Sequence, residues 1–258
     1  MSSNAPLFSL HSLRALASGL ADLLLPRACA ACERLLEPSD RGLVCGQCWS
    51  RLRPLPYPQC PRCGHPAREG RCRWCDLLPP YVRAVRSVCW LPGGTASRIV
   101  HALKYDGWSG VADGLAERMA RLAWPPDVIE ERALLVPVPL APVRQRERGY
   151  NQSALIASAL GARWRVPVAL DVLARMRATQ SQTRLTPSDR LRNVSGAFRA
   201  VDAARQRLAG THVVVVDDVV TTAATLNACA AALLDGGARI VSYVTFGRAP
   251  SEGDRWTQ

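Results

Sequence analysis

The stretch VVVVDDVVTTAAT, residues 213–225, decides the fold of this 258-residue chain. Four consecutive valines are typical of a β-strand that is buried on both faces, since a half-exposed strand would alternate with polar residues. Asp217 and Asp218 follow the valines, and a turn of small residues leads into the alanine-rich segment 222–237. A strand, a turn and a helix in this order are the repeating unit of an α/β protein.

The same alternation of apolar strands and helices continues on both sides of this stretch. The further predicted elements are strands at 82–91, 133–140 and 238–248, helices at 95–107, 111–124 and 151–164, and a short strand or helix at 168–176. Uniformly apolar strands separated by helices predict a parallel sheet flanked by helices on both faces. We assign this sheet to a domain of residues 80–258, which begins after a linker stiffened by Pro79 and Pro80.

The turn that follows the acidic pair is predicted to bind an anion. Ligands of parallel sheets bind at the carboxyl ends of the strands, and the first amides of a helix attract phosphate. Two adjacent carboxylates can accept hydrogen bonds from a vicinal diol. Together these features predict a site for a ribose 5-phosphate. The alternative is a strand with an acidic end and a helix with a threonine cap.

The N-terminal part of the chain contains four C-x-x-C pairs, made by eight of its ten cysteines: Cys29/Cys32, Cys45/Cys48, Cys60/Cys63 and Cys72/Cys75. Two such pairs complete a tetrahedral four-thiolate zinc site that has no open position. We therefore expect two structural zinc ions in a small domain of residues 27–79. Sequential pairing is preferred, and an interleaved arrangement stays open. A redox role is the weaker alternative, since no thioredoxin-like elements frame the pairs.

The chain carries a net charge of +12, and only one of its 33 basic residues, Lys104, is a lysine. Residues 141–205 contain twelve arginines and four acidic residues, so a polyanion is expected to dock there. Trp49, Tyr57 and Trp74 would offer stacking surfaces for unpaired bases. Genomic bias towards arginine, with aromatic residues that merely cover the zinc sites, is the alternative.

Residues 1–26 are predicted to form an amphipathic helix, because six leucines at positions 10, 13, 16, 20, 23 and 24 share one helical face. A secretion signal is not expected, since no basic residue precedes the apolar part and charged residues interrupt it. Membrane association of this helix is the minor alternative. We expect no transmembrane segment and a cytoplasmic protein.

The chain resembles the ComF (competence protein F) family, whose members join a double zinc ribbon to a type I phosphoribosyltransferase domain. VVVVDDVVTTAAT is similar to the phosphoribosyl-diphosphate-binding signature of these transferases, and RERGYNQSALIA, HALKYDG and TQSQTRLTPSDRLRNVSGAF resemble ComF motifs. The resemblance runs from LLLPRACAAC to the final predicted strand. It implies a part in natural transformation, with single-stranded DNA and proteins of the DNA-uptake machinery as partners.

The resemblance also implies which residues hold phosphoribosyl diphosphate. Asp217 and Asp218 would be the catalytic pair on the ribose hydroxyls, and the 5-phosphate would bind to Thr221, Thr222, Ala223, Ala224 and Thr225. A turn in VPVPLAPVRQRERGYNQ, residues 136–152, would be the pyrophosphate loop. The remaining expected contacts are Lys104, Arg144 and Arg148, and Gln180, Gln182, Arg190 and Asn193 of a mobile loop at 178–193. Mg²⁺ would bridge the diphosphate.

Ala223 departs from the family pattern, which commonly has glycine there. Alanine would be strained if the position requires a positive φ and harmless if the backbone is helical. Lys104 has its own alternative, an exposed surface lysine. Three functions stay open: a phosphoribosyl-diphosphate-binding protein that handles single-stranded DNA, an active phosphoribosyltransferase for an unknown acceptor, and a zinc-ribbon adaptor for a protein partner.

Overall fold

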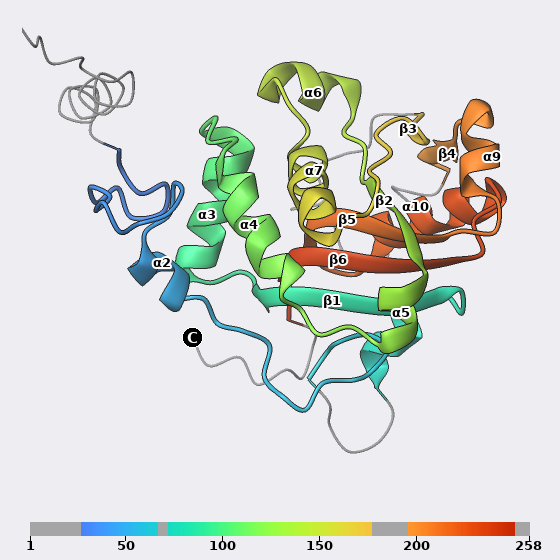
Figure 1. The fold of residues 1–258 in the computed structure, drawn as a ribbon, viewed down its shortest axis with the longest axis horizontal. Coiled ribbons are helices and arrows are strands. Elements are labelled where there is room, and N and C mark those ends of the chain that lie inside the picture. The colour runs from blue at the N-terminus through green and yellow to red at the C-terminus, as the bar shows by residue number, and fades with distance from the viewer. Residues whose placement is uncertain (1–26, 67–71, 177–195, 251–258) are drawn as a thin grey trace, which may run out of the picture.

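The structure, a computed structural model, describes residues 27–66, 72–176 and 196–250 (Figure 1). Its centre is a four-stranded parallel sheet in the order β1-β6-β5-β2. The strands are β1 (Val82–Trp90), β2 (Arg132–Pro137), β5 (His212–Val220) and β6 (Ile240–Arg248). The predicted parallel α/β sheet is confirmed, and the carboxyl ends of all four strands lie at one edge.

Helices and short segments connect these strands and cover the sheet. Between β1 and β2 lie α3 (Gly94–Tyr105), α4 (Val111–Ala120) and α5 (Pro126–Glu131). Between β2 and β5 lie α6 (Pro142–Arg148), α7 (Gln152–Trp164), the antiparallel strands β3 (Leu173–Arg175) and β4 (Phe198–Ala200), η3 (Asp202–Ala204) and α9 (Arg205–Leu208). Helix α10 (Ala224–Asp235) connects β5 to β6, and the N-terminal part contributes α2 (Gly46–Ser50) and η1 (Arg73–Leu77).

The sheet has a hydrophobic core on each face, and the four valines of β5 contribute alternately to the two cores, because successive side chains of a strand point to opposite faces. Val213 and Val215 belong to the core that contains α10, β3 and β4, whereas Val214 and Val216 belong to the core that contains α3, α4 and α7. All four are completely buried. This burial explains why the stretch is uniformly apolar instead of alternating.

The structure corrects two expectations about single elements and decides one that stood open. Strand β5, which was expected to end with Asp217 and Asp218, continues to Val220 and contains both aspartates in its interior. The expected turn after β2 contains the seven-residue helix α6. Residues 168–176, which fitted a strand or a helix, contain the strand β3.

Helix α3 has a position that matters for the site. In Figure 1 it stands beside the carboxyl ends of the strands, with α2 near its first residues and α6 near its last. Side chains at its two ends accordingly line two different cavities, one shared with residues that follow α2 and one shared with α6. The predicted helix at 1–26 lies outside the described residues. No helix in the described ranges has the length and hydropathy needed to cross a membrane.

Candidate functional site

The two aspartates of β5 are held by the first turn of α7 and by one lysine. Ser153 Oγ donates to Asp217 Oδ1 at 2.8 Å, and Gln152 Nε2 donates to Asp218 Oδ1 at 3.1 Å. Asp218 Oδ2 contacts Lys104 Nζ. Asp217 is partly exposed, whereas Asp218 is only 3% exposed. Asp217 is therefore the carboxylate that a ligand can reach, with Asp218 fixed behind it.

The two carboxyl groups differ in their affinity for protons. Burial raises the pKa of Asp217 to about 7, and the negative charge of Asp218 adds to the rise. Burial acts on Asp218 as well, but the charge and hydrogen bond of Lys104 outweigh it and hold the pKa of Asp218 below its ordinary value. Asp217 is thus the member of the pair whose ionisation changes near neutral pH.

Lys104 lies at the acidic pair and not on the open surface. Burial lowers its pKa, but the attraction of Asp218 more than compensates, so the pKa of Lys104 is raised overall. Its ammonium group stays charged at neutral pH, and 22% of its side chain remains exposed. Lys104 therefore joins the acidic pair to the solvent-accessible cavity beside α6.

The turn between β5 and α10 has the features expected of a phosphate site. Helix α10 begins at Ala224, and the first amides of a helix have no partner within it. Thr222 Oγ1 is buried without a hydrogen-bond partner among the described residues. Asp217 and the turn residues line a cavity of about 20 Å³, which is the size of one water molecule. A buried hydroxyl that lacks an acceptor suits an anion beside these amides.

Ala223 precedes α10 with φ of 58° and ψ of 5°, in the left-handed region. The position therefore requires the conformation in which alanine is strained. We expect Ala223→Gly to raise the free energy of unfolding by about 1 kcal/mol, because glycine adopts this conformation without a Cβ clash. Chemical denaturation of both proteins measures the difference.

The neighbouring substitution Ala224→Gly is the matched control for Ala223. Ala224 is the first residue of α10, where glycine lowers helix stability by up to about 1 kcal/mol. The two substitutions should thus act in opposite directions. Equal destabilisation by both would mean that the Ala223 backbone carries no strain.

A second cavity, of about 260 Å³, lies between the end of α3 and helix α6, and we call it the α6 cavity. It is lined by Lys104, Tyr105, Gly107, Arg144, Glu147 and Arg148. Arg144 forms an ion pair with Glu147 at 2.9 Å, and Arg148 donates to Gln152, whose amide holds Asp218. The structure therefore brings three of the predicted cationic contacts to one cavity next to the acidic pair.

Four predicted contacts of the mobile loop, Gln180, Gln182, Arg190 and Asn193, lie outside the described residues. The sequence interpretation also missed two residues of the site, Gln152 and Ser153, although it quoted the motif that contains them. A sequence signal was present, because asparagine is a favoured N-cap residue, and Asn151 caps α7 by accepting from Ser153 N at 3.0 Å. Gln152 and Ser153, which follow this cap, donate to the two aspartates.

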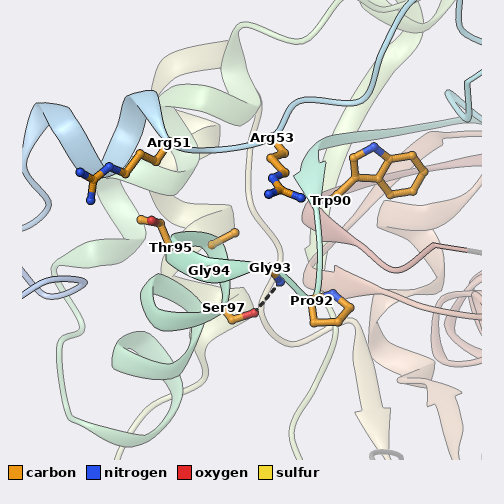
Figure 2. Close-up of a pocket in the computed structure, with 9 residues that line it drawn as sticks. Arg51, Arg53, Trp90, Pro92, Gly93, Gly94, Thr95 and Ser97 are labelled. Atoms are coloured by element: carbon orange, nitrogen blue, oxygen red, sulfur yellow. Dashed lines mark hydrogen bonds between the residues drawn. The ribbon is translucent and has the colours of Figure 1, made fainter. Parts of the chain in front are cut away.

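A third cavity, of about 660 Å³, opens at the start of α3, and we call it the α3 cavity (Figure 2). Nine residues line it: Arg51, Arg53, Trp90, Pro92, Gly93, Gly94, Thr95, Ala96 and Ser97. It lies at the end of β1, which is two strands away from β5 in the sheet. The cavity is therefore separate from the acidic pair.

The eight paired cysteines form two compact groups, and the pairing is sequential. Cys29, Cys32, Cys45 and Cys48 make one group, and Cys60, Cys63, Cys72 and Cys75 make the other, with sulfurs within 4.8 Å of one another. The closest sulfur pairs are 3.4 to 3.8 Å apart. Tetrahedral zinc with Zn–S bonds of about 2.3 Å requires sulfurs about 3.8 Å apart. Both groups fit a structural zinc ion.

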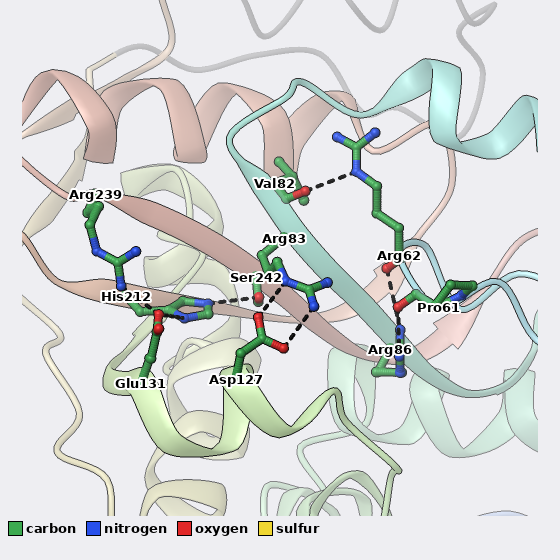
Figure 3. Close-up of polar contacts among 10 residues, drawn as sticks. All are labelled: Pro61, Arg62, Val82, Arg83, Arg86, Asp127, Glu131, His212, Arg239 and Ser242. Atoms are coloured by element: carbon green, nitrogen blue, oxygen red, sulfur yellow. Dashed lines mark hydrogen bonds and ion pairs between the residues drawn. The ribbon is translucent and has the colours of Figure 1, made fainter.

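The second zinc ribbon is attached to the central sheet by buried arginines. Arg248, at the end of β6, is fully buried and donates to the carbonyl of Cys63 at 2.7 Å. Arg86 of β1 donates to the carbonyl of Pro61 at 3.0 Å, and Arg62 donates back to the carbonyl of Val82 at 3.1 Å (Figure 3). Removal of this ribbon would take away part of the hydrogen bonding of two buried guanidinium groups, which would keep only their bonds to Ala123, Val85 and Ser87.

The aromatic residues of the ribbons serve mainly in packing. Trp74 is 3% exposed beneath Arg248, whose guanidinium carbon lies 4.2 Å from the ring centre. Trp49 is partly buried between Arg118 and Phe246. Only Tyr57 of the three predicted stacking residues is open, with 74% exposure. For Trp49 and Trp74 the packing alternative is correct.

Comparison with protein families finds both parts of the chain. Residues 20–78 match the double zinc ribbon domain, and residues 148–257 match the phosphoribosyl transferase domain. The second match covers α7, the acidic pair and the turn between β5 and α10. The glutamine phosphoribosylpyrophosphate amidotransferase of B. subtilis, solved with ADP and GMP, is 20% identical, with a TM-score of 0.35 over 52% of this chain and 25% of that one.

Curated relatives match most of the chain. DNA utilization protein YhgH of Salmonella typhimurium is 34% identical over 229 residues, which cover 85% of this chain and 96% of the relative. Competence protein F of Haemophilus influenzae is 27% identical over 77% of this chain and 87% of its own length. Together with the two domains, these similarities show that the chain belongs to the ComF family.

Proposed function

We propose that this protein binds phosphoribosyl diphosphate with Mg²⁺ and assists single-stranded DNA during DNA uptake or utilisation. The observation that supports this ligand is the arrangement of polar and charged groups around Asp217. Asp217, a reachable carboxylate, lines the small cavity at the turn, where Thr222 Oγ1 has no hydrogen-bond partner among the described residues. Its neighbour Asp218 contacts Lys104, which lines the cationic α6 cavity. A sugar that has a phosphate at one end and a diphosphate at the other matches this order of groups.

In this proposal the ligand spans the carboxyl edge of the sheet. The 5-phosphate binds to the amides at the start of α10 and to Thr222, which requires the small cavity at the turn to widen. The ribose hydroxyls donate to Asp217, with Asp218 as the positioning residue behind it. The diphosphate lies towards Lys104, Arg144 and Arg148. Asp217 would be the carboxylate that holds Mg²⁺, and the ion would neutralise charge on the diphosphate.

Calorimetric titration with phosphoribosyl diphosphate and Mg²⁺ tests the ligand. We expect saturable binding that weakens about tenfold or more in Asp217→Asn, because a hydrogen bond to a charged group is lost. Asp235→Asn removes the same charge from the far end of α10 and should bind like the unaltered protein. Absence of binding by the unaltered protein would refute this part of the proposal.

The pKa of Asp217 gives the proposal a pH signature. In the free protein this carboxyl has a pKa of about 7, so it carries a proton below that pH. A diol requires the ionised form as acceptor, and binding must then release the proton. Affinity should fall about tenfold for each pH unit below the pKa and level off above it. The same titration with Asp217→Asn isolates the ionisation of the ligand phosphates, and identical curves would contradict this role.

Two kinds of support favour the DNA part of the proposal. The relatives are named for DNA utilization and competence, and the described surface has exposed arginines at Arg51, Arg53 and Arg146. We place the protein in the cytoplasm, where thiols stay reduced and available for metal. Proteins of the uptake machinery would then meet it on the inner side of the membrane.

Transfer of the phosphoribosyl group to an acceptor is the second candidate function. The match to a phosphoribosyl transferase domain favours it. Release of labelled diphosphate in the presence of a panel of nucleobases would demonstrate it. Binding without turnover for any acceptor would favour a ligand-controlled DNA-handling protein.

A further inference from the structure

The α3 cavity has a lining suited to an anion. Among the nine described residues that line it, the charged ones are Arg51 and Arg53, and none of the nine is acidic. In Figure 2 both arginines lie on the chain segment at the end of α2, near the first turn of α3. Its volume of about 660 Å³ lies within the range of roughly 300–1,000 Å³ that is usual for ligand pockets.

Thr95 gives this cavity an unused hydrogen-bonding group. The residue is 5% exposed, and its hydroxyl has no hydrogen-bond partner among the described residues. It lies in the first turn of the twelve-residue helix α3, whose N-cap Gly93 provides no side-chain cap. The hydroxyl of Thr95, the first-turn amides and two guanidinium groups together suit a phosphate.

The frame of the cavity is fixed in the described structure. The carbonyl of Arg53 accepts from Trp90 N at 2.9 Å, and Pro54 pairs with Cys89 in an isolated bridge to β1. At the other wall, Gly93 N donates to Ser97 Oγ at 3.0 Å. The backbone at Arg53 is thus anchored to the end of β1, and the start of α3 is held by its own Ser97, which lowers the entropic cost of binding.

We propose that the α3 cavity binds a backbone phosphate of single-stranded DNA, held by Arg51, Arg53 and Thr95. The inference rests on the proposed function in DNA handling and adds the place where the strand is bound. The proposed DNA-binding region is then not residues 141–205, which the sequence favoured, but the junction between the first zinc ribbon and the sheet.

The exposed face of α3 favours a single strand over a small phosphate ligand. Arg98, His101 and Tyr105 are exposed and spaced three and four residues apart, so they share one face of the helix. Tyr105 is 62% exposed and offers a ring on which a base can stack. His101 Nδ1 lies within hydrogen-bonding distance of Asp106 Oδ2, at 3.1 Å. The face leads from the α3 cavity to the α6 cavity, about 14 Å along the helix axis.

Fluorescence anisotropy with a labelled oligothymidylate, repeated at several salt concentrations, tests the inference. We expect the double variant Arg51→Gln/Arg53→Gln to bind about tenfold more weakly. The slope of the logarithm of the binding constant against the logarithm of the salt concentration should become less steep by about 0.7 for each phosphate contact removed. Thr95→Val, which removes only the hydroxyl, should weaken binding by a smaller factor. Zinc content and thermal unfolding confirm that the variants fold.

Arg207→Gln is the control for loss of one positive charge. Arg207 follows β4 on another side of the sheet and pairs with Asp171, so oligonucleotide affinity should be unchanged. Affinity for phosphoribosyl diphosphate should be unchanged in all these variants. If the unaltered protein binds no oligothymidylate, the DNA part of the proposed function fails. If the unaltered protein binds oligothymidylate and the variants Arg51→Gln/Arg53→Gln and Thr95→Val bind it equally well, the α3 cavity is not the DNA-binding site. In that case only this inference fails.

Thymidine monophosphate and inorganic phosphate distinguish the source of the phosphate. We expect both to compete weakly with the oligothymidylate, because neither reaches the exposed face of α3. Competition by the mononucleotide at the affinity of the oligonucleotide would overturn the assignment and identify a free-nucleotide site.

Discussion

Replacement of Cys63 with serine is expected to reduce bound zinc from two ions per chain to one and to lower the free energy of unfolding by at least about 4 kcal/mol. A structural zinc site contributes about 10–16 kcal/mol of apparent binding free energy, which is available only to the folded chain. Cys63 is fully buried, and its carbonyl accepts from Arg248. Loss of the metal should therefore also expose a buried guanidinium. Metal analysis and chemical denaturation measure both effects.

Cys89→Ser is the matched control for this prediction. Cys89 is also completely buried but belongs to neither cysteine group. Its variant should keep two zinc ions per chain, whatever its effect on packing. If Cys63→Ser also kept two, the second cysteine group would not be the zinc site.

Lys104→Met is expected to lower the free energy of unfolding by about 3 kcal/mol, because it leaves a buried carboxylate without its counter-charge. Asp218 is 3% exposed, and Lys104 is the described cation that contacts it. The destabilisation should be smaller in mildly acidic buffer. Without the lysine, both carboxyl pKa values would lie above those of the unfolded chain, so protonation would favour the folded state.

The double variant Lys104→Met/Asp218→Asn should recover most of the lost stability, since it removes both charges. Arg121→Met is the control for an exposed pair. Arg121 is 73% exposed beside Glu117, and loss of such a pair changes stability by at most about 1 kcal/mol. Additive effects of the two substitutions at Lys104 and Asp218 would contradict a coupled buried pair.

Much of the fold could be predicted because its signals are local. The valines of β5, the alanines of α10 and the C-x-x-C spacing each depend on neighbouring residues. The continuation of β5 past the aspartates is harder to predict, because aspartates are unusual in strands and here partners on α7 and α3 stabilise them. Those partners could not be predicted, because Gln152 and Ser153 lie 66 and 64 residues away from the aspartates.

The ribbons show the same limit on sequence-based prediction. Spacing predicts two zinc sites but not their attachment to the sheet, which depends on Arg86 and Arg248 far along the chain. Because Cys63, Trp74 and Leu78 share a core with α10, truncation before residue 80 would remove part of that core. A truncated chain would therefore not separate an adaptor role of the ribbons from ligand binding.

A crystal structure of the protein soaked with phosphoribosyl diphosphate and Mg²⁺ tests the central proposal most directly. We expect the 5-phosphate beside Thr222 and the first amides of α10, the ribose hydroxyls on Asp217, and the diphosphate in the α6 cavity. A ligand bound elsewhere, with the turn at Ala223 unchanged and Asp217 still without a sugar, would contradict it.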